Sequence, residues 1–206
     1  TVNDVLVAAV TSAIRRYLVE HDSLVKQIRV AVPINLRPLD GPIELGNKFG
    51  LVYLPLPVGL SDAKARFNTL KATMDAIKRS PEAVVAHGLL GLIGLLPPAI
   101  KVPLLRLFGN KNSGVLTNVP GPRKPIYLAG SKLNSLMFWV PQSGGVGLGI
   151  SIISYNGTVN IGVAGDSGLV SDPHAIVRYF EQAFDTMLEQ VQNDGNVPLL
   201  PVPASE

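Results

Sequence analysis

The feature that most restricts the fold of this chain is the dipeptide Asn156-Gly157, which separates two runs with the composition of β-strands. Both residues tolerate the positive φ angles of a type I′ turn, the turn that joins two antiparallel strands most tightly. The flanking runs, residues 147–155 and 158–164, are rich in Ile, Val and Gly. We therefore predict an antiparallel hairpin, and a fold that contains a β-sheet.

Further strands are predicted along the chain. Residues 28–36 alternate between apolar and other residues, which is the period of a strand with one buried face. Pro33 has no amide hydrogen, so we expect that strand at a sheet edge or a bulge. Residues 49–58 are almost all apolar and predict a strand buried on both faces. Shorter strands are expected at residues 115–118, 126–128 and 135–140.

Three segments have helical periodicity. The first, residues 3–20, begins with Thr1 and Asp4 at the spacing of a capping box. In the second, Ser61 is the expected cap, Pro81 the stop, and the inward face carries Phe67, Leu70, Met74 and Ile77. The third starts at Ser171-Asp172-Pro173, with its apolar face formed by Ile176, Val177, Phe180, Phe184, Met187, Leu188 and Val191. Because helices and strands do not alternate strictly, we predict an α+β fold, a mixed sheet flanked by helices.

Residues 83–108 contain almost no charge. Pro97 and Pro98 interrupt any helix there, which leaves two pieces too short to cross a bilayer core of about 30 Å at about 1.5 Å per residue. We therefore expect a helical hairpin. Two interpretations stay open: both pieces are buried core, or they line an apolar tunnel or lie in a membrane interface.

Composition excludes several classes of function. The absence of cysteine removes thiol catalysis, disulfides and thiolate metal sites, and three isolated histidines predict no metal site. A net charge of +3, without basic runs interleaved with aromatics, predicts no nucleic-acid partner. With 47% hydrophobic residues, we expect some apolar surface to meet something other than water. We expect one domain at residues 1–192 and a Pro-rich tail at 193–206. Because the chain opens at a helix cap, we expect it to be cut from a longer protein.

Five short blocks follow one another in a specific order: Thr1-Val2-Asn3-Asp4-Val5, residues 33–38, residues 46–50, Thr117-Asn118-Val119-Pro120-Gly121-Pro122 and residues 147–159. In this order, over about residues 1–192, the chain resembles the carboxy-terminal domain of the bacterial and plant wax ester synthase/diacylglycerol acyltransferase family. The resemblance implies the carboxy-terminal half of a chloramphenicol-acetyltransferase-like fold, in which two α/β halves enclose a tunnel. The family's His-His-x-x-x-Asp-Gly element belongs to the other half and is absent here. We therefore expect no catalytic residue in this chain, and no activity from it alone.

The resemblance also implies roles for individual residues. Asn118, with Thr117 and Ser143, is a candidate donor to the oxyanion of the reaction; the alternative for Asn118 is a hydrogen bond to local backbone that shapes the Pro-rich turn. The candidates for the contact between the two halves or for the tunnel mouth are Asn3, Asp4, Arg37 and Asn47. For the first two the alternative is ordinary helix capping, and for Arg37 it is a CoA phosphate or Asp40. Candidates for the acyl tunnel or a membrane contact are Leu89, Leu90, Leu92, Ile93, Leu95 and Leu96.

The implied reaction transfers a fatty acyl group from acyl-CoA to a long-chain alcohol or to diacylglycerol. Acyl-CoA is a co-substrate, and no cofactor is expected. The expected partner is the amino-terminal half, in the same polypeptide or as a cleaved second chain, and the expected location is cytoplasmic, peripheral to membrane or lipid inclusions. Two alternatives remain: a non-catalytic lipid-binding domain of the same fold, and a condensation-type acyltransferase that acts on carrier-protein thioesters.

Overall fold

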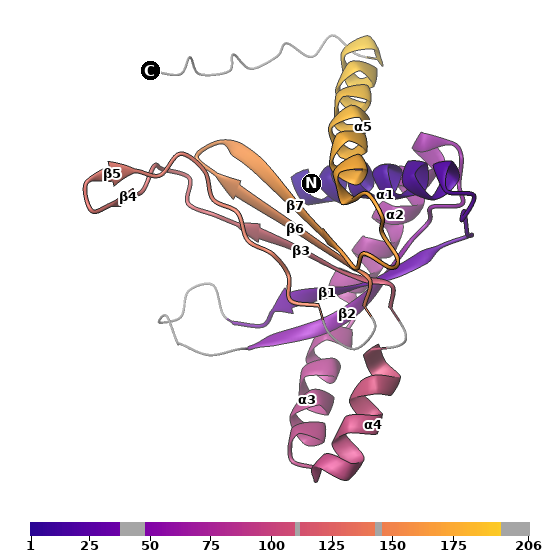
Figure 1. Cartoon of the computed structure of the whole chain (residues 1–206), viewed down its shortest axis with the longest axis vertical. Helices are drawn as coiled ribbons and strands as arrows, with labels where there is room; N and C mark the ends of the chain where they lie inside the picture. The colour runs from indigo at the N-terminus through magenta and orange to yellow at the C-terminus, as the bar shows by residue number, and fades with distance from the viewer. Residues whose placement is uncertain (38–47, 110–111, 143–145, 195–206) are drawn as a thin grey trace.

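The structure is a computed structural model that describes residues 1–37, 48–109, 112–142 and 146–194. Its centre is a mixed sheet in the order β2-β1-β3-β6-β7 (Figure 1). These strands are β1 (Ile28–Asn35), β2 (Phe49–Leu56), β3 (Gly114–Pro120), β6 (Leu148–Tyr155) and β7 (Thr158–Gly165). The pairs β1–β3 and β3–β6 are parallel, whereas β1–β2 and β6–β7 are antiparallel. The predicted α+β class with a mixed sheet is confirmed.

The hairpin predicted at Asn156-Gly157 joins β6 to β7. Asn156 has a φ of 47° and Gly157 a φ of 83°, and Tyr155 pairs with Thr158 across the turn. Both turn residues therefore adopt the left-handed backbone that the dipeptide predicts.

Three helices cover one face of the sheet: α1 (Val2–Glu20), α2 (Ala63–Arg79) and α5 (Pro173–Asp194). The main core lies between that face and these helices, and α1 supplies it with Leu6, Val7, Val10, Ala13, Ile14 and Tyr17, among others. The capping box of Thr1 and Asp4 is present as predicted. The cap of α2 is Asp62 rather than Ser61, because the Asp62 carboxylate accepts a hydrogen bond of 2.7 Å from the Ala65 amide. On α5, Ile176 and Phe180 are buried, but Phe184, Leu188 and Val191 further along are exposed.

The prediction of an edge position for the strand with Pro33 is wrong, because β1 lies between β2 and β3. The Leu36 amide donates to the Lys48 carbonyl oxygen on the β2 side. Backbone amides along a strand point alternately to its two neighbours, so the nitrogen of Pro33, three residues earlier, points toward β3. There β3 pairs only with Val30 and Ala31. Pro33 is tolerated in an inner strand because no partner strand needs its missing hydrogen.

The prediction that β2 is buried on both faces is also wrong. Its residues alternate between buried and partly exposed, with Val52, Leu54 and Leu56 turned to the core. The reason is its place at the end of the sheet order, as an antiparallel edge strand whose second face has no comparable helical cover.

Residues 135–140 do not form the predicted strand. They cross the second face of the sheet and are held there by side chains instead of a ladder. The Ser151 hydroxyl donates to the Phe138 carbonyl, and the Tyr155 hydroxyl donates to the Leu133 carbonyl at 2.8 Å. The Gln142 amide donates to the Ala164 carbonyl at 2.9 Å. The short strands β4 (Tyr127–Leu128) and β5 (Ser131–Lys132) form a separate ribbon that projects from the body (Figure 1).

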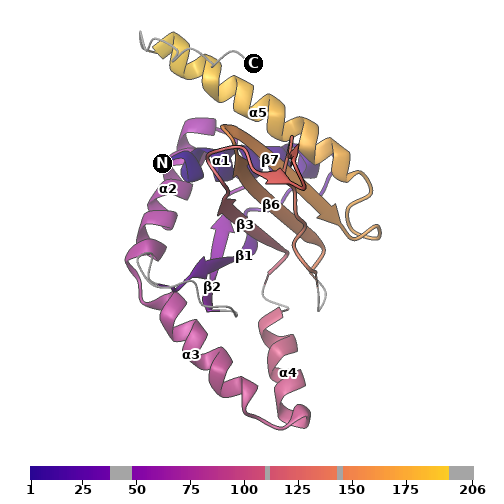
Figure 2. The ribbon, with the colours of Figure 1, turned by 90° about the vertical axis from the view of Figure 1, so that its left-hand side faces the viewer.

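Residues 83–108 form the predicted hairpin, with helices α3 (Glu82–Gly94) and α4 (Pro98–Gly109) on either side of the Pro97-Pro98 break. Both views show the two helices reaching away from the sheet, at the end of the molecule opposite α5 (Figures 1 and 2). Of their described side chains only that of Ile93 is buried, so the interpretation of this hairpin as core is wrong. In the described part of the chain, no helix has the length and apolar character needed to span a membrane.

Candidate functional site

A cavity of about 520 Å³ opens between the sheet and the ends of two helices. Its walls come from the first turns of α1, the last turns of α2, the carboxy-terminal parts of β1, β3 and β6, the middle of β2 and the start of β7. The lining residues are mostly apolar: Val2, Leu6, Val32, Pro33, Ile34, Val52, Leu54, Met74, Ile77, Pro120, Ile152 and Val159, with the polar residues Asn3, Lys78, Asn118 and Ser154. A mostly apolar pocket with a few convergent polar groups is the usual form of a small-molecule site.

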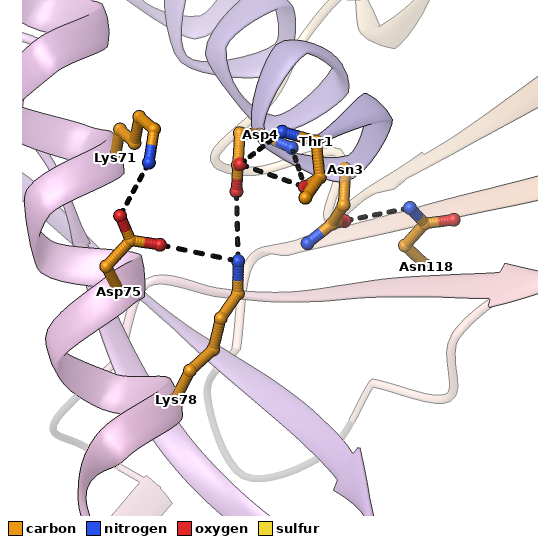
Figure 3. Close-up of polar contacts among 7 residues, drawn as sticks. All are labelled: Thr1, Asn3, Asp4, Lys71, Asp75, Lys78 and Asn118. Atoms are coloured by element: carbon orange, nitrogen blue, oxygen red, sulfur yellow. Dashed lines mark hydrogen bonds and ion pairs between the residues drawn. The ribbon is translucent and has the colours of Figure 1, made fainter.

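Two of the predicted site residues meet at this cavity. The Asn118 side-chain amide donates a hydrogen bond of 2.8 Å to the Asn3 side-chain oxygen, which joins β3 to the first turn of α1 (Figure 3). Within the described part of the chain, the remaining amide hydrogens of both side chains have no acceptor. A carboxamide has two N–H donors, so the pair can still donate hydrogen bonds to a ligand in the cavity.

Asp4 points away from Asn3 and is part of a charged cluster beside the cavity. Its side chain is only 2% exposed and accepts hydrogen bonds from the Thr1 backbone nitrogen at 2.7 Å, the Thr1 hydroxyl at 2.9 Å and Lys78 Nζ at 3.3 Å. Burial raises the pKa of Asp4, but these hydrogen bonds and the charge of Lys78 outweigh it and lower that pKa to about 2. Asp4 is therefore a permanent anion and a poor candidate for proton transfer at neutral pH.

Lys78 brings the only positive charge among the cavity-lining residues of the described chain. Its ammonium lies 3.3 Å from Asp4 and 3.7 Å from Asp75, and Asp75 in turn pairs with Lys71 at 2.6 Å (Figure 3). The Lys78 side chain is partly exposed, so its remaining donor capacity is available at the cavity rim. The sequence offered one signal for it, since Lys78 follows Met74 by one helical turn on the inward face of α2.

The other predicted site residues do not gather at the cavity. Thr117 precedes Asn118 in β3, and side chains alternate along a strand, so it faces the other side of the sheet. The Arg37 amide donates to the Asn35 side chain at 3.0 Å, and Arg37 Nε is buried without a partner among the described residues. Asn47, Ser143 and the Asp40 partner suggested for Arg37 lie outside the described residues. None of the six candidates in α3 and its following turn lines the cavity: Leu89, Leu90, Leu92, Ile93, Leu95 and Leu96.

Comparison with known proteins gives a consistent result. The family model described as WS/DGAT C-terminal domain matches residues 45–188. A Mycobacterium tuberculosis (H37Rv) protein named as the diacylglycerol O-acyltransferase Rv1760 is 28% identical over 198 residues, which cover 92% of this chain and 39% of that protein. The diacylglycerol O-acyltransferase tgs1 of the same strain is 26% identical over 189 residues, 89% of this chain and 41% of that protein. The chain thus spans about two fifths of the length of these relatives.

Two solved structures share the fold. The wax ester synthase/diacylglycerol acyltransferase from Marinobacter aquaeolei VT8 superposes with a TM-score of 0.65 at 22% identity, over 93% of this chain and 44% of that one. A condensation domain that releases chains from the enacyloxin polyketide synthase gives a TM-score of 0.54 at 15% identity, over 98% of this chain and 38% of that one. These likenesses establish the chloramphenicol-acetyltransferase-like fold expected from the sequence.

Proposed function

The chain belongs to the WS/DGAT C-terminal domain family, and on that premise we propose that it is the carboxy-terminal half of an acyl-CoA-dependent O-acyltransferase. The acceptor is a long-chain alcohol, which gives a wax ester, or diacylglycerol, which gives a triacylglycerol. The names of the relatives support this reaction class, and the family match favours it over condensation on a carrier protein. The domain extends over residues 1–192, with the residues beyond it as a tail.

The observation that carries the proposal is the Asn3–Asn118 pair on the wall of an apolar cavity. Residues 115 positions apart in the sequence place two carboxamides in contact, and both line the same cavity. The apolar walls suit a fatty acyl chain, whose burial is favourable by roughly 0.8 kcal/mol for each methylene. The free amide hydrogens suit the polar end of that chain, the thioester or ester carbonyl.

The reaction needs two kinds of group, and this chain supplies one of them. A histidine of the amino-terminal half takes the proton of the acceptor hydroxyl, whose oxygen attacks the thioester carbonyl of acyl-CoA. The carbonyl oxygen becomes an oxyanion, which accepts a hydrogen bond from Asn118 while Asn3 fixes the direction of that amide. Collapse of the tetrahedral intermediate expels the CoA thiolate, which takes up the proton from the histidine.

The same proposal assigns supporting roles to other residues. Asp4 and Lys78 form the rim of the cavity and hold the first turn of α1 against α2. Arg37 and Asn47 belong to the contact with the amino-terminal half, where Arg37 also suits a phosphate of CoA because its guanidinium is a fork of donors. Ser143 remains a secondary candidate for the oxyanion, whereas Thr117 faces the other side of the sheet. The amino-terminal half is part of the same polypeptide or a cleaved second chain, and the enzyme works in the cytoplasm at the surface of membrane or lipid inclusions.

The first test is acyl transfer from a labelled acyl-CoA to a long-chain alcohol and to diacylglycerol. We expect no transfer by this chain alone, and transfer once it is combined with an amino-terminal half that carries His-His-x-x-x-Asp-Gly. Activity in neither case, with lipid still bound by this chain, would support the alternative of a non-catalytic lipid-binding domain. That alternative rests on the absence of the histidine element from this sequence.

A second test concerns Asn118. In the complete enzyme, Asn118→Ala is expected to lower kcat by about a hundredfold, the usual effect of removing one oxyanion donor, with the acyl-CoA KM little changed. Thr117→Ala is the matched control, since Thr117 is the neighbouring residue of β3 but faces the other side of the sheet. A loss of thermal stability with normal kcat per folded molecule would mean that Asn118 only shapes the turn before Gly121.

A further inference from the structure

Helix α3 of the hairpin exposes an apolar stripe. Val85, Leu89 and Leu92 follow one another at the spacing of a helical face, and all three are exposed. Leu92 is 66% exposed, and Leu95 in the turn is 84% exposed, the largest value for a large apolar side chain in the described part of the chain. On α4, Ile100 and Val102 are also exposed. Apolar residues at this spacing normally face a core, whereas these face outward.

Beyond Glu82, the first residue of α3, the charged residues of the hairpin have one sign. Residues 83–109 contain no Asp or Glu, whereas they include Lys101 and Arg106. Both cations follow the Pro97-Pro98 break, so they belong to the second helix. A surface that covers this stripe must therefore be apolar and must tolerate positive charge at its boundary.

The polar groups of the hairpin are concentrated at its base, where it is fixed to the sheet. The Glu82 carboxylate accepts a hydrogen bond of 3.4 Å from the Tyr53 amide, and His87 Nδ1 lies 2.9 Å from the Phe49 carbonyl oxygen. Gly50 permits this approach, because a Cβ there would lie 2.0 Å from the Ala83 carbonyl oxygen. The base is thus held against the edge strand β2, and the apolar turn lies at the far end (Figure 2).

We propose that the α3–α4 hairpin is a lipid-surface anchor, which inserts Leu92, Leu95 and the Pro97-Pro98 turn into the acyl region of one lipid leaflet that carries anionic headgroups. Each helix is about 20 Å long, too short to span a bilayer but long enough to reach through the headgroups of one leaflet. Lys101 then lies at the level of the anionic headgroups. The occupant is lipid rather than a protein face, because three features match the polarity gradient of a leaflet: a polar base, an apolar tip, and Lys101, which has no acidic partner among the described residues.

The anchor deepens the proposed function. Its benefit to the enzyme rests on that function, but its binding to lipid does not. Long-chain alcohols and diacylglycerol dissolve in lipid, so an enzyme that acylates them benefits from a fixed position on the lipid surface. Vesicle binding itself is measured without turnover, so its result and the result of the acyl-transfer assay are independent of each other.

The test is co-sedimentation of the complete protein with vesicles of phosphatidylcholine alone and of phosphatidylcholine with 30% phosphatidylglycerol, roughly the anionic share that makes a surface attract basic residues. Replacing two inserted leucines, as in Leu92→Asp/Leu95→Asp, is expected to weaken binding to both vesicles by at least about tenfold. Lys101→Gln is expected to weaken binding only to the anionic vesicles, by about fivefold. The matched control is Leu128→Asp on the β4–β5 ribbon, where the replaced leucine is 69% exposed; it is expected to bind as the unchanged protein does.

Three outcomes would overturn the anchor. One is unchanged vesicle binding by the double variant while its thermal melting matches that of the unchanged protein. Another is a protein that ignores vesicles but forms dimers that the double variant dissociates, which would make the stripe a contact between copies. The third is a hairpin that binds no vesicle and resists protease only when the amino-terminal half is present, which would make the stripe part of the contact between halves.

Discussion

Helix α1 and the α3–α4 hairpin both carry an apolar helical stripe, yet the two stripes lie in opposite environments. In α1 the apolar residues from Leu6 to Tyr17 are buried against the sheet, α2 and α5. In the hairpin only Ile93 is buried among the described side chains. The difference shows that an apolar helical stripe predicts a helix and the face that will be covered, but does not identify what covers it.

The physical origin of the difference is the number of neighbours that each segment can reach. α1 is tied to the loop before α2, where Arg15 donates to the Val58 carbonyl at 2.7 Å. The buried Arg66 of α2 donates to the Leu60 carbonyl at 2.7 Å and to the Ser12 hydroxyl at 3.0 Å. The hairpin is fixed to the rest of the chain chiefly at its base, along β2. A helix held on several sides buries its stripe within its own domain, and a helix held at one end presents it to a partner.

The strongest test of this contrast is to truncate one apolar residue in each segment. Ile14→Ala in α1 is expected to lower the free energy of unfolding by about 2–5 kcal/mol, because Ile14 is 3% exposed and its removal leaves a cavity in the core. Leu92→Ala in the hairpin is expected to change it by less than about 0.5 kcal/mol. Urea unfolding of both variants measures the difference. Equal losses would mean that the hairpin is packed as tightly as α1.

The buried charge at the start of α1 gives a smaller effect that depends on pH. The pKa of Asp4 is lowered to about 2 in the folded chain, so its contribution to stability is complete above the unfolded pKa near 4 and is lost as the pH falls toward 2. Asp4→Asn is expected to cost about 2 kcal/mol at pH 7. The difference from the unchanged chain should vanish between about pH 4 and pH 2. The free energy of unfolding of both chains, measured across that pH range, tests this prediction. A difference that does not change with pH would show that the charge of Asp4 is not the cause of the lost stability.

The smallest effects are expected at two glycines, one in the β6–β7 turn and one in the hairpin. Gly157→Ala is expected to destabilise by about 1 kcal/mol, because its φ of 83° is strained for any residue with a Cβ. Gly88→Ala in α3 is expected to stabilise by roughly 0.5–1 kcal/mol, since a Cβ there meets nothing within 4 Å and alanine favours the helix. Thermal melting of the pair measures both shifts. A destabilising Gly88→Ala would indicate that something packs closely against that side of α3.

Local patterns predicted most of the elements. The capping box, the Asn156-Gly157 turn and the proline break at Pro97-Pro98 each depend on residues adjacent in sequence, and each is confirmed. The errors concern what lies beside an element. Pro33 lies in an inner strand because β3 pairs with β1 only at Val30 and Ala31, so the missing Pro33 amide hydrogen costs no hydrogen bond between these strands. Residues 135–140 are held by side chains of β6 rather than by the backbone hydrogen bonds of a strand pair.

For the candidate site, too, the sequence indicated individual residues but not what lies beside them. Asn3, Asp4 and Asn118 were singled out from the sequence by a family resemblance, but their contacts with one another and with Lys78 were not. Lys78 was not among the candidate site residues that the sequence indicated. Its role at the cavity depends on how α2 crosses the start of α1, which no spacing in the sequence encodes.

The sequence by itself determined the α+β class, the hairpin turn, the broken apolar helix and the family, because these follow from backbone preferences and from short blocks in a fixed order. Only the tertiary structure decided that the Asn3–Asn118 pair lies on an apolar cavity, that Thr117 faces away from it, and that the apolar hairpin is exposed. Those facts depend on which distant segments come together, and the free energy of that packing is shared among many residues rather than written in any one of them.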